Sequence, residues 1–316
     1  MVSPCPLPTW CRNDDCLPTV TTEYTAVIMM HCVQELMEYA QESEFLKSCV
    51  KRTSFNVAKM ANDSIIVTSK NMLCLREGES IDSEVIDCHL QILEDQYNAR
   101  VDDSNRRILT VQCTFSGTFV PAHGLAFEDH YFEQTWKLHS YMWKGVNFLS
   151  VDKVYIPWYT KSTTHWSLVV VNKLQCRFEY YNSWLADPKK EPEYSGMILF
   201  FWKFLAWQWK QKGIGGLLER SKIKPTSGWD WYIPKPTLKA VGKLLADEIP
   251  GQSKMCDCGV LTCMYVKYLS LGRAWDFTYK DVPKFRLMMV RDICRTPPPP
   301  THTLSNGVTT DVQPPG

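Results

Sequence analysis

One cysteine of the chain stands where a reactive thiol is expected. Cys258 closes the segment Gly251-Gln-Ser-Lys-Met-Cys-Asp-Cys258, directly before an apolar stretch with helical character. The macrodipole and unpaired N–H groups at a helix start favour the thiolate, which is the nucleophilic form of cysteine. Cys256 lies before the helix and Cys263 more than a turn inside it, so Cys258 is the preferred nucleophile. The alternative is an inert cysteine buried in its helix.

A candidate base and its orienter come from a predicted hairpin. Two apolar runs flank Lys173 and Leu174, and a turn centred between these two residues sets His165 opposite Asn182. Side chains paired in this way have Cβ atoms about 4.5–5.5 Å apart. An amide beside an imidazole can fix its tautomer and leave the other ring nitrogen to take a proton from a thiol. The alternative for His165 alone is a surface residue at a strand edge.

A further polar residue precedes the nucleophile. Gln252 lies six positions before Cys258, in the loop that approaches the helix. Its side-chain amide can donate to a developing oxyanion, together with a backbone N–H at the helix start. An ordinary polar loop residue is the alternative, and local sequence does not separate the two.

Taken together, these motifs resemble a known family. His165-Trp166, Tyr181-Asn182-Ser183, Pro250-Gly251-Gln252 and Asp257-Cys258-Gly259-Val260 are similar to motifs of the ubiquitin-like-protein-specific cysteine proteases, the Ulp/SENP family. That family has His-Trp, an Asp about seventeen residues later, and Gln six residues before Cys in an Asp-Cys-Gly context. The resemblance covers roughly residues 65–290.

The resemblance implies an α+β, papain-like fold in which the nucleophile helix packs on a twisted, mostly antiparallel sheet. It also implies cleavage after the C-terminal Gly-Gly of a SUMO-type modifier, as isopeptidase, precursor-processing enzyme or both. Cys258 would then be the nucleophile, His165 the base, Asn182 the orienter and Gln252 the oxyanion donor. Trp166 would help wall a narrow channel for the glycines. No metal or cofactor is implied.

Three features depart from the family pattern. Asn182 stands where most relatives have Asp, and Ser80 stands where a Trp forms the other wall of the glycine channel. The segment between Asn182 and Cys258 is long and dense in tryptophan. It is expected to be either a helical insertion with its own core or a modified docking surface. The first two departures leave open an inactive homologue that binds a modifier. The sequence is also compatible with a mobile-element peptidase that has another protein substrate, and more remotely with an acyltransferase.

Composition limits the remaining possibilities. The 316 residues are 45% hydrophobic and 12% aromatic, enough for a substantial core. The formal net charge of +1 gives no reason to expect nucleic acid or membrane as a partner. The N-terminus lacks a basic region followed by an apolar run, and 13 cysteines are scattered. We therefore expect a nuclear or cytoplasmic protein with free thiols rather than a secreted one. A monomer is also expected.

The elements that position these residues follow from pattern. Helices are predicted around residues 26–48, 69–78, 80–93 and 257–271, with Ser80 or Asp82 as cap of the third, and a strand over 153–157 is expected to stop at its proline. Residues 1–60 form an N-terminal segment, partly helical or irregular. Residues 61–294 form the protease-like domain, with the aromatic-rich insertion near 184–240. Residues 295–316 form a proline-rich tail that is expected to be disordered.

Overall fold

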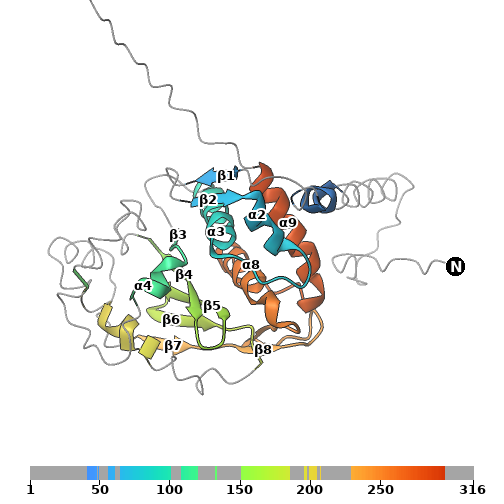
Figure 1. Ribbon diagram of the computed structural model, residues 1–316. Coiled ribbons are helices and arrows are strands. Elements are labelled where there is room, and N and C mark those ends of the chain that lie inside the picture. Colours follow the sequence, from blue (N-terminus) through green and yellow to red (C-terminus); the bar gives the residue numbers. More distant parts are fainter. Residues whose placement is uncertain are drawn as a thin grey trace, which may run out of the picture.

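The computed structural model describes residues 41–47, 49, 56–60, 65–100, 108–119, 132–133, 151–185, 196–197, 199–204, 207 and 229–295 (Figure 1). Residues 1–40 of the predicted N-terminal segment and the predicted tail beyond residue 295 lie outside these residues. Of the helix predicted over 26–48, only the part from residue 41 is described, and residues 41–47 are helical.

A five-stranded mixed sheet, in the order β3-β4-β5-β6-β7, carries the predicted base. Its strands are β3 (Ile108–Thr110), β4 (Lys153–Thr160), β5 (His165–Asn172), β6 (Arg177–Tyr181) and β7 (Asp230–Tyr232). The three central strands are antiparallel, whereas β3 and β7 each join an edge in parallel. The sheet is therefore antiparallel at its centre, where His165 opens β5.

Both faces of the sheet are buried, which explains the continuous apolar run in β5. Leu168 and Val170 face one core, and Val169 and Val171 face the other. Successive side chains of a strand point to opposite faces, so a strand covered on both sides has no polar face to alternate with. The first core lies against the helices and the second against aromatic side chains.

Three helices build the first core (Figure 1): α3 (Ser83–Asn98), α8 (Cys258–Leu271) and α9 (Val282–Arg295). Every residue of α8 from Cys258 to Val266 is buried, and α8 packs against both α3 and β5. A helix that is apolar on all sides is expected in such a place. The helix predicted over 257–271 is thus confirmed, and it ends at Gly272, whose φ of 61° is the left-handed conformation of a C-terminal cap.

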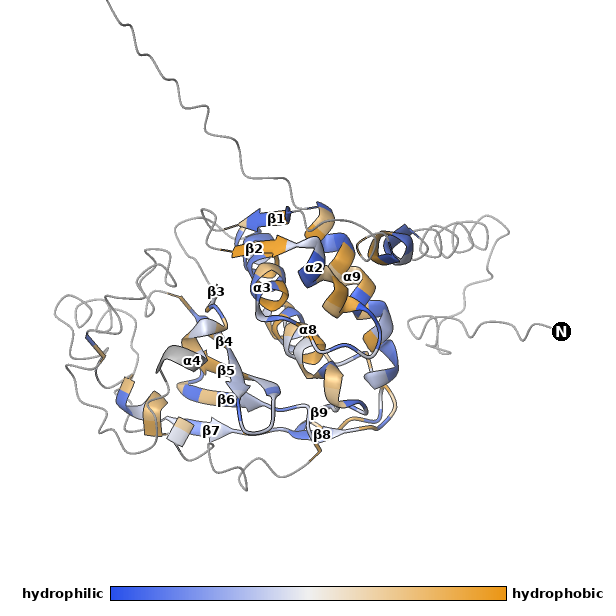
Figure 2. Cartoon of the chain, in the orientation of Figure 1, coloured by the Kyte–Doolittle hydropathy of each residue, from blue (hydrophilic) through white to orange (hydrophobic). Residues whose placement is uncertain are grey.

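An N-terminal hairpin belongs to the same core. Strands β1 (Asn56–Met60) and β2 (Ile65–Thr68) are antiparallel, and Ala58, Ile65 and Val67 are buried in the first core. Figure 2 shows the hydrophobic character of β2 beside that of α9. The boundary predicted between residues 60 and 61 therefore falls inside a hairpin whose two strands share one core.

The helices predicted over 69–78 and 80–93 are present with shifted limits. The first is α2 (Ser69–Met72) followed by the 3-10 turn η2 (Leu73–Leu75), and the second is α3. Asp82 occupies the N-cap position of α3, but its carboxylate accepts from Asn71 Nδ2 at 3.3 Å and makes no cap bond. The N-cap position predicted for Asp82 is therefore confirmed, but the capping hydrogen bond is absent, because the carboxylate ties α3 to α2 instead.

The predicted stop of a strand at Pro157 is also wrong, since β4 runs on to Thr160. Tyr155 O accepts from the N–H of Val111, and Tyr159 N–H donates to Ser116 Oγ, both at the outer edge of β4. Pro157 lies two residues from both Tyr155 and Tyr159, so its nitrogen points to the same edge of β4. Among the described residues, β3 pairs with β4 only as far as Tyr155. A proline is tolerated in a strand where no partner needs its N–H.

The described part of the tryptophan-rich segment covers the second face of the sheet. Phe200, Phe201, Phe204 and Trp207 share a core with Val169 and other residues of the sheet, and Trp231 stacks on Phe178 with ring centroids 4.9 Å apart. Residues 196–197, 199–204 and 207 are helical, as expected, but the separate core expected for the insertion is wrong for these residues. Their aromatic side chains are the other half of the central core.

Two short strands lead to the nucleophile. Strand β8 (Lys235–Thr237) pairs in parallel with β9 (Glu248–Pro250), and Gly251 N–H donates to Thr237 O at 2.7 Å. A Cβ on Gly251 would lie 2.9 Å from Leu185 Cδ2 and 3.2 Å from the Thr237 backbone. Only glycine fits there, and it fixes the start of the loop that carries Gln252. No helix in the described part of the chain has the length and apolarity needed to cross a bilayer.

Candidate active site

Cys258 is the first residue of α8 and is almost fully buried. Burial raises the pKa of its thiol, while hydrogen bonds from the backbone N–H groups of Trp166, Gly259 and Cys258 itself act in the opposite direction. The helix start thus favours the thiolate, as predicted, but desolvation is the larger effect. The thiol form is the resting state at neutral pH, and a base has to remove its proton.

His165 lies at the start of β5, directly before Trp166, whose N–H reaches the Cys258 sulfur. The strand and the first turn of α8 therefore meet at this point. The imidazole is buried, and burial lowers its pKa, with a smaller opposing contribution from the hydrogen bond to Asn182. His165 is accordingly neutral at pH 7 and able to accept a proton.

The contacts of Asn182 determine which nitrogen of His165 is basic. Asn182 Oδ1 lies 2.8 Å from His165 Nε2 and accepts the backbone N–H of Trp184 at 2.8 Å. A backbone N–H can only donate, so the atom that it contacts is the amide oxygen. The Nε2 of His165 must then carry a proton to donate to the same oxygen. Nδ1 is left as the proton acceptor.

The hairpin register predicted for this pair is wrong, although the two side chains meet. The strands pair Leu168 with Tyr181 and Asn172 with Arg177, which leaves a four-residue turn centred one residue later than predicted. Continued to His165, this register places Trp184 opposite the imidazole, and the two rings lie 5.3 Å apart. Asn182 is a diagonal neighbour, which is still within reach of a side chain.

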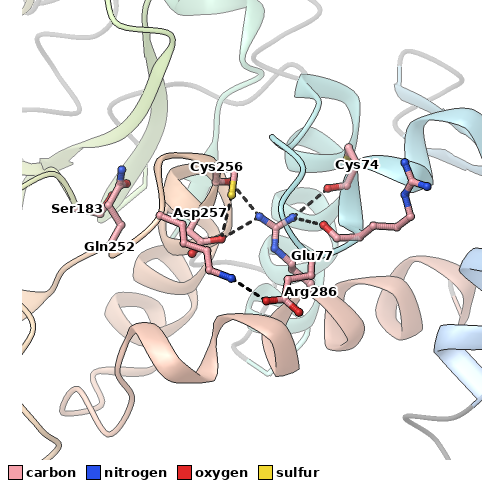
Figure 3. A network of polar contacts seen from close by, with 9 residues as sticks. Cys74, Glu77, Ser183, Gln252, Cys256, Asp257 and Arg286 are labelled. Atoms are coloured by element: carbon pink, nitrogen blue, oxygen red, sulfur yellow. Dashed lines mark hydrogen bonds and ion pairs between the residues drawn. The ribbon is translucent and has the colours of Figure 1, made fainter.

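Gln252 is held by Ser183, the residue after the predicted orienter Asn182. Its Oε1 accepts from Ser183 Oγ at 2.7 Å, and its backbone N–H donates to Ser183 O at 2.9 Å (Figure 3). The Tyr265 hydroxyl of α8 donates to Pro250 O at 2.5 Å and anchors the same loop. With its oxygen occupied, Gln252 presents its Nε2–H₂ group as a donor. Adjacent residues, Asn182 and Ser183, thus hold the predicted base His165 and the predicted amide donor Gln252.

The two predicted substrate-binding residues, Trp166 and Ser80, lie beside the first turn of α8. Trp166 is half-buried and packs on its cross-strand neighbour Tyr159, with ring centroids 4.7 Å apart. Ser80 is exposed, and the next residue, Ile81, is buried against Gly259, where an added Cβ would lie 3.0 Å from Ile81 Cβ. The Ser80–Ile81 segment therefore borders the first turn of α8.

Sequence reasoning missed several residues of this site. The contacts of Ser183 and Trp184 could not be predicted, because they depend on the register of the hairpin. Arg286 of α9 is almost fully buried and pairs with Asp257 at 3.0 Å, one residue before Cys258. No spacing signal connects Arg286 with Cys258, since the two lie on different helices. Within the described residues, no group of three or more His, Cys, Asp or Glu side chains could hold a metal ion.

Comparison with known proteins agrees with this architecture. The chain is 22% identical over 257 residues to the ubiquitin-like-specific protease ESD4 of Arabidopsis thaliana, covering 81% of this chain and 46% of that protein. It is 29% identical over 155 residues to the mouse Sentrin-specific protease 2, covering 48% of this chain and 21% of that protein. The chain therefore spans less than half the length of either relative.

A solved structure has the same fold. The C-terminal Ulp1 protease domain, in complex with SMT3, the yeast orthologue of SUMO, superposes with a TM-score of 0.56 at 17% identity, covering 80% of this chain and 93% of that one. The papain-like α+β fold is thereby confirmed. The profile of the family described as "Ulp1 protease family, C-terminal catalytic domain" matches residues 79–297. The chain belongs to the Ulp1 protease family.

Proposed function

We propose that this protein is a cysteine peptidase that cleaves after the C-terminal glycines of a SUMO-type modifier. One observation carries the proposal: Asn182 Oδ1 is fixed by the Trp184 N–H and holds His165 Nε2 at 2.8 Å, which leaves Nδ1 as the basic nitrogen. The residue after His165, Trp166, reaches the Cys258 sulfur with its N–H. Family membership supports the peptidase class. The structure of a related domain bound to SMT3 supports the class of modifier.

The reaction begins from two neutral groups. His165 Nδ1 takes the Cys258 proton as the sulfur attacks the carbonyl carbon of the last glycine, because burial disfavours a preformed ion pair. The carbonyl oxygen becomes an oxyanion, and the Gln252 Nε2–H₂ group and the N–H groups at the start of α8 donate to it. His165 then returns the proton to the leaving amine as the C–N bond breaks. Water hydrolyses the thioester with His165 as base.

A substrate that ends in glycine is supported by family membership. Trp166, whose N–H reaches the Cys258 sulfur, packs with Tyr159 and provides an aromatic surface on β5 next to that sulfur. Ser80 supplies a small, exposed side chain where the family pattern has a Trp, and Ile81 after it packs against Gly259.

A modifier that carries a C-terminal electrophile tests the proposal. We expect a SUMO-type probe to label the protein covalently, Cys258→Ala to abolish labelling, and the neighbouring Cys256→Ala to retain it. Ubiquitin and other modifiers with the same electrophile define the specificity. Binding of the unreactive modifier without any labelling would identify an inactive homologue instead. Labelling that survives Cys258→Ala would show that another thiol is the nucleophile.

A further inference from the structure

The buried arginine behind the nucleophile turn links two parts of the chain. Arg286 Nη1 donates to Cys74 O at 3.0 Å and Arg76 O at 3.1 Å, and Nη2 donates to Cys256 O at 2.9 Å and Asp257 Oδ1 at 3.0 Å (Figure 3). A guanidinium is planar and rigid, so its two sets of contacts are fixed relative to each other. The segment around η2 and the residues directly before α8 are therefore held at a fixed distance from each other.

A second ion pair lies beside the first but at the surface. Lys254 Nζ contacts Glu77 Oε1 at 2.7 Å, and both side chains are more than half exposed. Exposed pairs contribute little to stability because water screens them. The buried Arg286–Asp257 pair is different, since an unpaired charge at that depth would be strongly unfavourable.

The position of Asp257 gives this pair a second consequence. Asp257 is the N-cap residue of α8, where an Asp side chain ordinarily accepts an N–H of the first turn. Here it makes no such bond, and its Oδ1 accepts from Arg286 instead. The first-turn N–H groups remain directed at the Cys258 sulfur. An Asp without its arginine would add an uncompensated negative charge and a competing acceptor next to that sulfur.

We propose that Arg286 is a positioning residue that draws the Asp257 carboxylate away from the first turn of α8 and neutralises it. The N–H groups of that turn then stay available to the Cys258 sulfur and to the oxyanion. The part that concerns the oxyanion rests on the function proposed above. The part that concerns the sulfur does not, since it depends only on the charges around one thiol.

The ionisable groups around the sulfur define what a pH titration reports. They are Cys256 and Asp257 before α8, His165 from β5, Tyr265 within α8 and Arg286 from α9. Only the last of these changes in the Arg286 variants. A shift in the titration of Cys258 in these variants therefore reports the loss of the Arg286 charge, and a variant that also lacks the Asp257 charge separates its direct effect from the loss of compensation at Asp257.

The test is the pH dependence of Cys258 alkylation by iodoacetamide in the full chain, followed by peptide fragmentation that separates Cys258 from Cys256 and Cys263. For Arg286→Met we expect a profile displaced upward by about one pH unit and a rate at pH 7 lower on the order of tenfold. Asp257→Asn/Arg286→Met removes both charges and should return the profile close to that of the unchanged protein. Arg286→Lys keeps the positive charge but loses the paired contacts of the guanidinium group. The pH profile of this variant should be displaced by an intermediate amount.

Thermal unfolding of each variant shows whether the fold is retained. If Arg286→Met does not fold, the comparison of Arg286→Lys with the unchanged protein decides. Profiles of folded Arg286 variants that coincide with the original would overturn the proposal, as would a double variant that stays displaced. Absence of probe labelling in the unchanged protein would refute the peptidase function but not this role, because alkylation needs no modifier.

Discussion

Asn182 holds the imidazole of His165 without bringing a charge to it. A carboxylate in this place would stabilise the imidazolium, whereas an amide fixes only tautomer and orientation. The Trp184 N–H secures that orientation, because it prevents the amide from turning its NH₂ group toward His165. At the residue scale, the site therefore combines a well-oriented base with a weakly stabilised conjugate acid.

The pH dependence of labelling follows from this chemistry. Burial lowers the pKa of His165 below its usual value, so the imidazole stays neutral at pH 7 and above. We expect probe-labelling rates to be steady from pH 7 to 9 and to fall below about pH 6. Asn182→Asp should raise the pKa of His165, move the acid limb to higher pH, and increase the rate at pH 8 several-fold.

The matched control for that substitution is Asn182→Ala, which removes both the oxygen and its bond to Trp184 N–H. Its rate should fall at every pH, with little displacement of the acid limb. An Asn182→Asp profile that overlays the original would mean that His165 does not titrate as the base. The measurement is the second-order rate constant of labelling across the pH range.

At the scale of elements, α8 brings its first turn unusually close to α3 and the segment before it. Gly259 lies against Ile81 and against Ile86 of α3, where an added Cβ would come within 3.0 Å and 3.3 Å. The helix can approach this closely only because its second residue has no side chain. The Ser80–Ile81 border of the site depends on that approach.

Gly259→Ala should therefore destabilise the protein despite the better helix propensity of alanine. Overpacking typically costs about 1–3 kcal/mol, against a gain of roughly 1 kcal/mol from propensity. We expect a lower denaturation midpoint and slower probe labelling. Gly196→Ala is the control, since no atom of the described residues lies within 4 Å of its added Cβ. A midpoint for Gly259→Ala at or above that of the unchanged protein would show that Ile81 moves aside freely.

Local pattern was enough to locate α8 and the hairpin strands, but not how the strands pair. The turn between β5 and β6 has no Gly or Asn to mark its centre. Cys176, a residue that rarely adopts such a conformation, has a φ of 49° there. The course of β4 through Pro157 and the role of Arg286 depend on partners distant in sequence, which no local pattern encodes. The contact between His165 and Asn182 was nevertheless predicted correctly. The predicted register is wrong by a small shift that makes the two residues diagonal rather than direct neighbours, and their side chains still reach each other.

At the scale of the whole molecule, the core contains a charge-sensitive group away from the site. His89 of α3 is fully buried, and neither ring nitrogen has a hydrogen-bond partner among the described residues. Burial lowers its pKa to about 3, and the nearby Lys267 acts in the same direction. The folded protein keeps His89 neutral at pH values where the unfolded chain would protonate it.

Stability should consequently fall on acidification. The folded-state pKa is depressed, so the unfolded state binds a proton first, and stability decreases as pH drops below about 6.5. Between pH 7 and pH 5 we expect a loss of about 2 kcal/mol from this residue. His89→Leu should remove that loss, as measured by chemical denaturation at both pH values. Equal losses in the variant and the unchanged protein would assign the acid sensitivity to other groups.

The pairing of Ser183 with Gln252 joins the loop before α8 to the end of β6. The same loop is held from the other side, because the Tyr265 hydroxyl of α8 donates to Pro250 O. His165 and Asn182 at the ends of β5 and β6, Gln252 in the loop and Cys258 on α8 therefore belong to one connected set of contacts. A displacement of α8 against the sheet would have to break the Tyr265–Pro250 hydrogen bond, so the distances among the proposed catalytic groups are fixed together.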